Sequence, residues 1–357
     1  MDDSRMTRIP HNKPFITSED RAAVDAVLQS GWLAQGSVVK QLEADFVRFF
    51  SGGAACAVSS GTASIFLALH ALGVQAGDSV ALPTYACSAL LNAVYMIRAK
   101  PVLVDILPDT LCLNSVLLAS TSIAPKAAIV VNTYGASGDA HTLQKSGIPV
   151  IEDCCQSLGG NLSGLPLGVQ GDISIFSFYA TKIITGGQGG MLWSRSPGLV
   201  DQAIDYRQFD CREVYVPRFN LQMTDLQAAL IRSQMGRLAD ICARRQLIAA
   251  RYLHALPDGL SAQAGLGDSG RMPYRFVVIC PNPGIRHALR SHLHSFGIDC
   301  AVPIEKYELL HRYLQLDPTS FPVAENLADT SLSLPIHLHL TDDQVDFIAH
   351  ALTLFRV

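Results

Sequence analysis

The sequence predicts an α/β fold, in which a doubly wound, mostly parallel sheet forms a large domain and a smaller α+β domain follows. Short β-type runs alternate with helical patterns between residues 54 and 207, and this alternation is typical of a parallel sheet with helices on both faces. The length of 357 residues suggests about two domains. We therefore expect a large domain over residues 1–235, including an N-terminal arm and helices, and a small domain over residues 236–357.

Two helices are predicted ahead of the sheet. Residues 1–16 are expected to form an irregular arm. The first helix begins at Ser18, where Thr17 or Ser18 can act as the N-cap and acidic residues occupy the first turn, and it ends near Gly31. The second helix covers about residues 38–50, where apolar side chains recur at a helical period.

Predicted strands and helices alternate between residues 54 and 207, which we call the α/β region. Its predicted strands are residues 54–59, 79–82, 101–106, 127–131, 149–151 with Glu152 and Asp153 at its end, 173–178 and 190–193. Its predicted helices are residues 62–72, 85–98, 141–145 and 197–207. Ligands of such sheets bind outside the carboxyl ends of the strands. The residues just past the strand ends are therefore the first candidates for a functional site.

A less regular pattern follows residue 207. Residues 208–219 are predicted to form a loop, after which a long helix over about residues 223–252 leads into the second domain. The elements expected there are a strand at 274–280, a helix at 285–296, a strand at 299–302 and a final helix at about 341–355, capped by Thr341.

Composition excludes several classes of function. The net charge of −4 gives no electrostatic footprint for nucleic acid or anionic membranes. Only 16% of residues are charged, against a usual share of about 25%, which fits burial in an oligomer or a large core. The polar start of the chain is unlike a signal peptide, and the longest apolar run is too short to span a bilayer. Nine cysteines without a C-x-x-C pair predict reduced thiols and a cytoplasmic protein.

A small-residue segment joins the strand at 54–59 to the next helix. The run Ser59-Ser-Gly-Thr-Ala-Ser64 places Gly61 and Thr62 at a helix N-terminus. Free N–H groups and the helix dipole suit an anion there, and Gly61 lets the backbone approach it closely. The alternative is an ordinary Ser/Thr helix cap.

Two acids, Glu152 and Asp153, end a buried strand. A carboxylate at this place can pair with a protonated ring nitrogen, which pyridoxal 5′-phosphate requires of its protein. The alternative is a capping or loop aspartate. Asp105 ends its own predicted strand in the same way, and we interpret it as structural.

One lysine, Lys182, follows the strand at 173–178 in a loop that goes on to four glycines. It can serve as a Schiff-base lysine or as a solvated loop residue. The anion site, the acid and the lysine occur in chain order at three strand ends of one predicted sheet. A pyridoxal 5′-phosphate site needs a phosphate cradle, a partner for the ring nitrogen and a lysine, so the three together indicate such a site.

The chain resembles the sugar aminotransferases of the DegT/DnrJ/StrS family, which are fold type I pyridoxal 5′-phosphate enzymes. The resemblance covers nearly the whole chain and is most specific from Asp153 to Gly190. Its motifs are Ser30–Gly36, Ser60–Thr62, Gly77–Val80, Pro101–Asp105, Tyr134–Gly135, Ile151–Gln156, Gly171–Asp172, Phe176–Lys182, Gly186–Gly190, Phe219–Asn220, Leu226–Ala229 and Leu334–His337.

The resemblance implies a role for each matching residue. Lys182 is expected to form the Schiff base and to move the proton, while Asp153 holds the pyridine nitrogen protonated. Gln156 is expected near the ring hydroxyl. The phosphate positions are Gly61, Thr62 and Ser177, joined by Asn220, which in the family reaches the phosphate of the neighbouring subunit. That last match implies a homodimer with shared active sites.

Three departures from the family pattern concern the substrate end of the site. An aromatic residue often covers the cofactor ring where this chain has Cys87, so either Cys87 or Tyr85 is expected to cover it. Gln188 stands where the glycine loop usually carries Glu, and Asn220 is followed by Leu221 and Gln222 in place of an aromatic residue and Arg. A subset of the family replaces the lysine with histidine and deoxygenates its substrate, and the presence of Lys182 favours transamination.

Two further patterns are interpreted as structural. His337 and His339 have the spacing of a strand face, but no Cys or acid accompanies them at ligand spacing, and no metal site is predicted. Cys154 and Cys155 are adjacent, and adjacent cysteines seldom form a disulfide in a relaxed backbone.

The expected function is the transfer of an amino group from L-glutamate to a nucleotide-linked keto-deoxysugar. A second hypothesis keeps the cofactor and replaces the acceptor with an aminocyclitol or another non-nucleotide ketone. A third is a regulatory or scaffold protein that binds the cofactor without catalysis.

Overall fold

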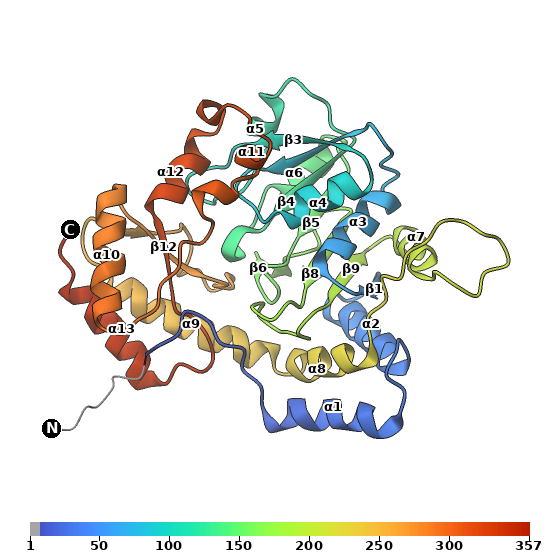
Figure 1. Cartoon of the computed structure of the whole chain (residues 1–357), viewed down its shortest axis with the longest axis horizontal. Coiled ribbons are helices and arrows are strands. Elements are labelled where there is room, and N and C mark those ends of the chain that lie inside the picture. Colours follow the sequence, from blue (N-terminus) through green and yellow to red (C-terminus); the bar gives the residue numbers. More distant parts are fainter. Residues whose placement is uncertain (1–7) are drawn as a thin grey trace.

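A seven-stranded sheet lies at the centre of the computed structural model, which describes residues 8–357 (Figure 1). Its strand order is β1-β9-β8-β5-β4-β2-β3. The strands are β1 (Ala54–Val58), β2 (Ser79–Pro83), β3 (Lys100–Val104), β4 (Ala127–Val131), β5 (Val150–Asp153), β8 (Ile173–Ser177) and β9 (Gly190–Ser194). All pairs are parallel except those made by β9, which runs antiparallel to both β1 and β8. The predicted α/β fold with a mostly parallel sheet is confirmed.

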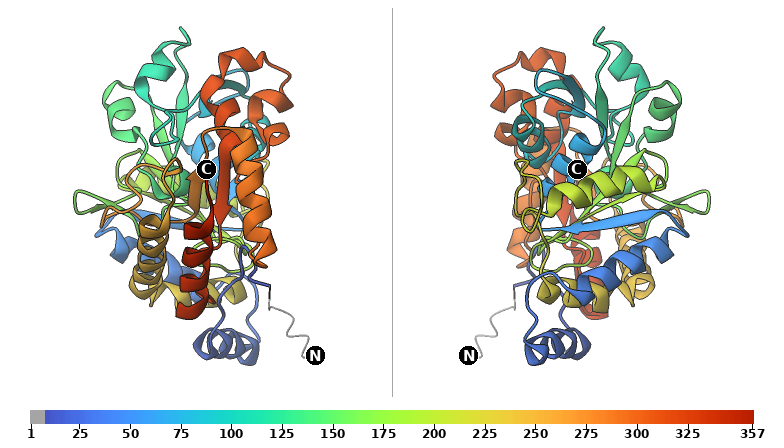
Figure 2. Two further views of the ribbon diagram at one scale, coloured as in Figure 1. Left: turned by 90° about the vertical axis from the view of Figure 1, so that its left-hand side faces the viewer. Right: turned by 90° about the vertical axis from the view of Figure 1, so that its right-hand side faces the viewer.

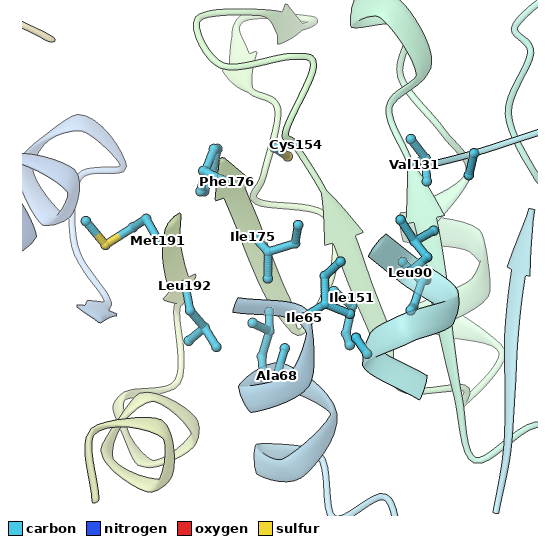
Figure 3. Close-up of a cluster of buried hydrophobic side chains, with 14 of the residues drawn as sticks. Ile65, Ala68, Leu90, Val131, Ile151, Cys154, Ile175, Phe176, Met191 and Leu192 are labelled. Atoms are coloured by element: carbon cyan, nitrogen blue, oxygen red, sulfur yellow. The ribbon is translucent and has the colours of Figure 1, made fainter. Parts of the chain in front are cut away.

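Alternate residues of the strands face opposite layers of helices. Ala128 and Val130 of β4 belong to a core shared with α5 (Ser115–Ala119) and α6 (Ala140–Lys145). Ile129 and Val131 instead belong to the main core on the other face, which includes α3 (Gly61–Ala71) and α4 (Ala89–Met96). Figure 3 shows side chains of α3 directed at the sheet, where Ile65 and Ala68 meet Ile151, Ile175 and Leu192. This two-sided packing is the doubly wound arrangement.

The N-terminal helices form as expected. Helix α1 (Ser18–Ser30) begins after Thr17, whose hydroxyl accepts the N–H of Asp20, and it ends at Gly31 in the left-handed conformation with φ 71°. Helix α2 (Ser37–Phe49) follows. Residues 1–7 of the predicted arm lie outside the described residues, whereas Ile9 pairs with Ile298 in the C-terminal half.

Two predicted helix boundaries were wrong. Helix α4 begins at Ala89 and not at Tyr85, because the chain bends after β2. Thr84 holds this segment, since it donates its N–H to the carbonyl of Val104 and its own carbonyl accepts the N–H of Leu310. The long helix predicted over residues 223–252 is two helices, α8 (Asp225–Met235) and α9 (Leu238–Ala255), which follow each other along the lower side of Figure 1. The break falls at Gly236, a poor helix former, and Arg237, which pairs with buried Asp20 at 2.6 Å.

The C-terminal half contains a small antiparallel sheet, β10-β11-β12. Figure 2 shows helices packed side by side against it. The elements are β10 (Ser261–Ala262), β11 (Phe276–Ile279), α10 (Pro283–Ser295), α11 (Leu310–Tyr313), α12 (Pro322–Thr330), β12 (Ser331–Leu334) and α13 (Asp342–Leu354). The strand predicted at 299–302 is absent from residues 8–357, because only Ala301 pairs there, with Ser333. Strand β12 and the short helices α5, α11 and α12 were not predicted.

Three further elements lie at the surface of the α/β region. They are the hairpin β6 (Asn161–Leu162) and β7 (Leu165–Pro166) and helix α7 (Pro197–Arg207). The loop after α7 projects from the right side of Figure 1. Among the described residues, no helix combines the length and the apolar character that crossing a membrane requires. The division of the chain at residues 235 and 236 remains a prediction; it falls at the break between α8 and α9.

Candidate active site

A cavity of about 420 Å³ lies at the carboxyl ends of β1, β5 and β8. Strands β1 and β8 both pair antiparallel with β9, so their carboxyl ends reach the same edge of the sheet. The predicted residues that line the cavity are Gly61, Thr62, Cys87, Asp153, Gln156, Ser177 and Lys182. Four sequence segments that are separate in the chain are thus brought together at one site, as the strand-end argument requires.

The phosphate candidates form a tight cradle at the N-terminus of α3. Ser60 caps this helix by accepting the N–H of Ala63 over 3.1 Å. A Cβ added to Gly61 would lie 2.9 Å from Ser177 Cβ, so only glycine leaves space between the helix and the end of β8. Exposed N–H groups, a helix N-terminus and the Ser177 hydroxyl are donors suited to a phosphate, and this geometry fits the phosphate of pyridoxal 5′-phosphate.

The two acids at the end of β5 point to opposite faces of the sheet. Asp153 lines the cavity and accepts the N–H of Cys155 over 2.9 Å. Burial raises the pKa of Asp153 above its ordinary value, because a charged carboxylate is costly away from water. A cationic neighbour offsets this cost and stabilises the charged form. Glu152 lies on the other face, where the amide of Asn132 and the N–H of Gly168 donate to one oxygen at 2.9 and 2.8 Å. Its other oxygen accepts N–H groups of the same loop.

We expect Glu152→Gln to lower the free energy of unfolding by about 2–3 kcal/mol, because the new NH₂ group faces buried N–H donors of the loop at 168–171. Denaturant midpoints measure the change. The exposed Asp258→Asn is the control and should stay within about 0.5 kcal/mol of wild type. An unchanged midpoint for Glu152→Gln would show that this carboxylate does not anchor the loop.

The amine of Lys182 faces the cavity and lies over an aromatic ring. Its Nζ is 5.3 Å from the ring centroid of Tyr274. Burial alone lowers the pKa of the lysine, but the phenol of Tyr274 and the acidic groups of Cys155 and Asp153 outweigh it, so the pKa lies above the ordinary value. The loop after the lysine is held by Gln234, whose side chain bonds both the N–H and the carbonyl of Thr185 at 2.9 and 3.0 Å.

The residues predicted near the cofactor ring differ in position. Cys87 lines the cavity, whereas Tyr85 is buried away from it, with its hydroxyl 3.2 Å from that of Tyr134. Of the two candidates for covering the cofactor ring, only Cys87 lines the cavity. Gln156 also lines the cavity, and its carbonyl accepts the N–H of Tyr134 over 2.9 Å.

Asn220 does not line the cavity of its own chain. It is exposed on the segment that follows the projecting loop, and its carbonyl accepts the N–H of Gln222 over 3.3 Å. Its neighbour Leu221 accepts the N–H of Ser59 at the end of β1.

Several polar and aromatic lining residues were not predicted, and four of those named next belong to the C-terminal half. They are Tyr179, Tyr274, Arg275, Glu308 and Tyr313. The available signal was the polar pair Tyr274-Arg275 ahead of an apolar strand pattern. Nothing in the order of the chain shows that this pair reaches the edge of the large sheet.

The residues interpreted as structural have clear structural partners. Asp105 accepts the N–H groups of Val323 and Ala324 at 2.9 and 3.0 Å, and so caps α12. His337 and His339 each contact a carbonyl of the N-terminal arm, at 3.0 and 2.9 Å. Within residues 8–357 no group of three or more His, Cys, Asp or Glu side chains has an arrangement that could hold a metal.

The chain is similar to several known aminotransferases and to a protein of polysaccharide biosynthesis. The sequence profile of the DegT/DnrJ/EryC1/StrS aminotransferase family matches residues 14–353. The spore coat polysaccharide biosynthesis protein SpsC of Bacillus subtilis is 31% identical over 373 residues, covering 96% of each chain. The structure of an aminotransferase TlmJ from Streptoalloteichus hindustanus is 30% identical, with a TM-score of 0.89 and 98% of each chain covered.

A further solved structure bears on the cofactor. It is the PLP-form of Spr1654 from Streptococcus pneumoniae, with 25% identity, a TM-score of 0.89 and 98% of each chain covered. The cradle at Gly61, the buried Asp153 and the cavity lysine suit the phosphate, ring nitrogen and aldehyde of that cofactor. With a family profile matching nearly the whole chain, the protein belongs to the DegT/DnrJ/EryC1/StrS family of sugar aminotransferases, which use pyridoxal 5′-phosphate.

Proposed function

We propose that this enzyme moves the amino group of L-glutamate to the ketone of a nucleotide-linked keto-deoxysugar, for the synthesis of a glycan, a lipopolysaccharide or a natural product. One observation carries the proposal: a single cavity joins the Lys182 amine to Asp153 and to the cradle at Gly61. The same cavity continues to Gln188 and to Tyr313 of the C-terminal half, which leaves room for substrates beside the cofactor.

Each proposed role follows from the chemistry of the side chain. Bound pyridoxal 5′-phosphate supplies an electron sink for the carbon that bears the amino group. The N-terminus of α3 and Ser177 bind its phosphate. Asp153 keeps the ring nitrogen protonated, since its buried carboxylate gains most from a cationic neighbour. Lys182 Nζ carries the proton to and from the reacting carbon.

The nucleotide-linked sugar is the finer part of the proposal. SpsC, which is 31% identical, takes part in polysaccharide biosynthesis by its name, and sugars enter polysaccharides from activated donors. Gln188 and Glu308 are among the polar groups of the cavity that offer hydrogen bonds to a sugar. An aminocyclitol or another free ketone is the alternative acceptor.

We also propose a homodimer in which each subunit completes the other's site. Asn220 is exposed and does not line its own cavity, and the loop before it exposes Val214 and Tyr215 at 72% and 89%. Large apolar side chains exposed together on one loop suit burial in an interface. The nine free cysteines support a cytoplasmic location, where thiols stay reduced.

The test is mass spectrometry of products formed from L-glutamate and a panel of keto-deoxysugars, each offered with and without its nucleotide. Amination of the nucleotide-linked sugars only, with inhibition by a nucleoside diphosphate, is the expected result. Amination of the free ketones without such inhibition would contradict the proposed acceptor. Bound cofactor whose absorbance stays unchanged with every amino acid would indicate a non-catalytic protein.

A further inference from the structure

Arg275 is a cation in the active-site cavity that the proposed roles leave unused. It precedes β11 and lines the cavity together with Tyr274 and Lys182. Its guanidinium carbon lies 5.8 Å from the ring centroid of Tyr274, and Lys182 Nζ lies 5.3 Å from the same centroid. The guanidinium and the reacting amine therefore both lie close to the same aromatic ring.

No internal carboxylate neutralises this arginine. Among residues 8–357, no Asp or Glu forms an ion pair with Arg275. Its Nη1 makes only long contacts with neutral groups, at 3.5 Å to His11 Nε2 and 3.4 Å to Ser333 Oγ. The carboxylate of Glu308, which shares the cavity, accepts the N–H of Glu305 in its own turn. A partly buried guanidinium without an anion suits an anionic ligand.

The neighbouring Arg245 differs from Arg275, because its guanidinium is used to hold the backbone. Arg245 is buried, and it donates to the carbonyls of Pro273 and Tyr274 at 3.0 and 2.5 Å. These bonds hold the backbone just ahead of Arg275 without using the side chain of Arg275. Its planar group is left free to bind a ligand in the cavity.

The surroundings of Arg275 orient it without adding a competing charge. Burial, together with the positive charges of Arg275 and His337, lowers the pKa of His11 to about 4, so His11 is neutral at neutral pH. The face of the Tyr134 ring lies 6.0 Å from the guanidinium carbon, within the range of cation–π attraction. The arginine is thus held by an aromatic ring and neutral polar atoms, and its charge is available to the cavity.

We propose that Arg275 binds a carboxylate of the amino donor and so places the donor amine beside Lys182. The proposal rests on the proposed function, in which the donor is an amino acid. Every such donor has an α-carboxylate, and L-glutamate has a second one on its side chain. A guanidinium pairs with either group through two parallel hydrogen bonds.

The experiment uses the full-length enzyme loaded with cofactor and compares Arg275→Gln and Arg275→Lys with wild type. For Arg275→Gln we expect KM for L-glutamate in the donor half-reaction to rise about 10- to 100-fold. The dissociation constant of 2-oxoglutarate, measured by calorimetry without turnover, should rise by a similar factor. Arg275→Lys should recover part of both losses because it keeps the charge.

Controls separate a donor site from a folding defect. Arg290→Gln removes one exposed charge from the C-terminal half, and it should change neither constant. Melting temperatures show whether each variant is folded. A rise in KM for both L-glutamate and L-glutamine assigns the α-carboxylate, whereas a rise for L-glutamate alone assigns the side-chain carboxylate.

Two results would overturn the proposal: unchanged affinity of Arg275→Gln for L-glutamate and 2-oxoglutarate, or a loss confined to the nucleotide-linked sugar. The second would make Arg275 a phosphate-binding residue. If the wild-type enzyme takes another amino acid in place of L-glutamate, the donor in the proposed function is wrong, and the Arg275 comparison is made with that amino acid.

Discussion

Lys182→Ala is expected to lower the rate of amino transfer about 10⁴-fold, which is the upper end of what a positioned acid–base group contributes. The methyl group that replaces the amine can neither accept nor return a proton, and no other lysine lines the cavity among residues 8–357. Product formation from L-glutamate and the best acceptor found measures the loss. The phosphate cradle and Asp153 remain in this variant, so it should still retain the cofactor on a desalting column.

The controls for this lysine are Lys182→Arg and Lys145→Ala. Arginine keeps the positive charge but stays protonated at neutral pH, so Lys182→Arg should be nearly as inactive as the alanine variant. Lys145 is exposed at the end of α6, and its removal should leave the rate unchanged. Transfer by Lys182→Ala at the wild-type rate would refute the proposed mechanism.

Asp153→Asn is expected to lower the rate about 10²- to 10³-fold, the usual cost of losing one preorganised electrostatic partner. The amide has the shape of the carboxylate but lacks its charge, so it cannot hold a ring nitrogen protonated. The loss should appear in both half-reactions, because both require the same electron sink. Rates of each half-reaction, followed by the absorbance of the bound cofactor, measure it.

Asp105→Asn provides a matched control at the end of another strand. Asp105 caps α12 and does not line the cavity, so its replacement should cost about 1 kcal/mol of stability and leave the rate unchanged. Equal losses of rate in the two aspartate variants would mean that the effect of Asp153 is structural. A wild-type rate for Asp153→Asn would remove its proposed partnership with the ring nitrogen.

The order of strands and helices in the α/β region was predictable because it depends on short-range pattern. Helix α7 has the bounds that its sequence predicts, Pro197–Arg207, with proline in its first turn. Strand β4, Ala127–Val131, is apolar throughout, as expected for a strand covered on both faces. Such elements carry their own signals in propensity, caps and periodicity, so no distant contact is needed to find them.

The prediction from sequence missed or misplaced those elements whose bounds depend on contacts between residues far apart in the chain. The chain from Tyr85 to Ser88 has helical propensity but remains non-helical, because Thr84 before it is bonded to β3 and α11. The helix predicted across Gly236 is interrupted where Arg237 pairs with Asp20, more than two hundred residues away. These partners lie far away in the sequence. A local sequence pattern therefore cannot predict their effect on where a helix begins or ends.

The same division applies to the candidate site. The sequence by itself determined the strand-end position of Gly61, Asp153 and Lys182, since the end of a strand is a local property and glycine, acid and lysine are local chemistry. Only the tertiary structure decided that Glu152 faces a loop while Asp153 faces the cavity, and that Tyr274 and Arg275 join the site from the C-terminal half. The physical reason is that side-chain direction and the approach of a second layer depend on long-range packing, which one stretch of sequence does not specify.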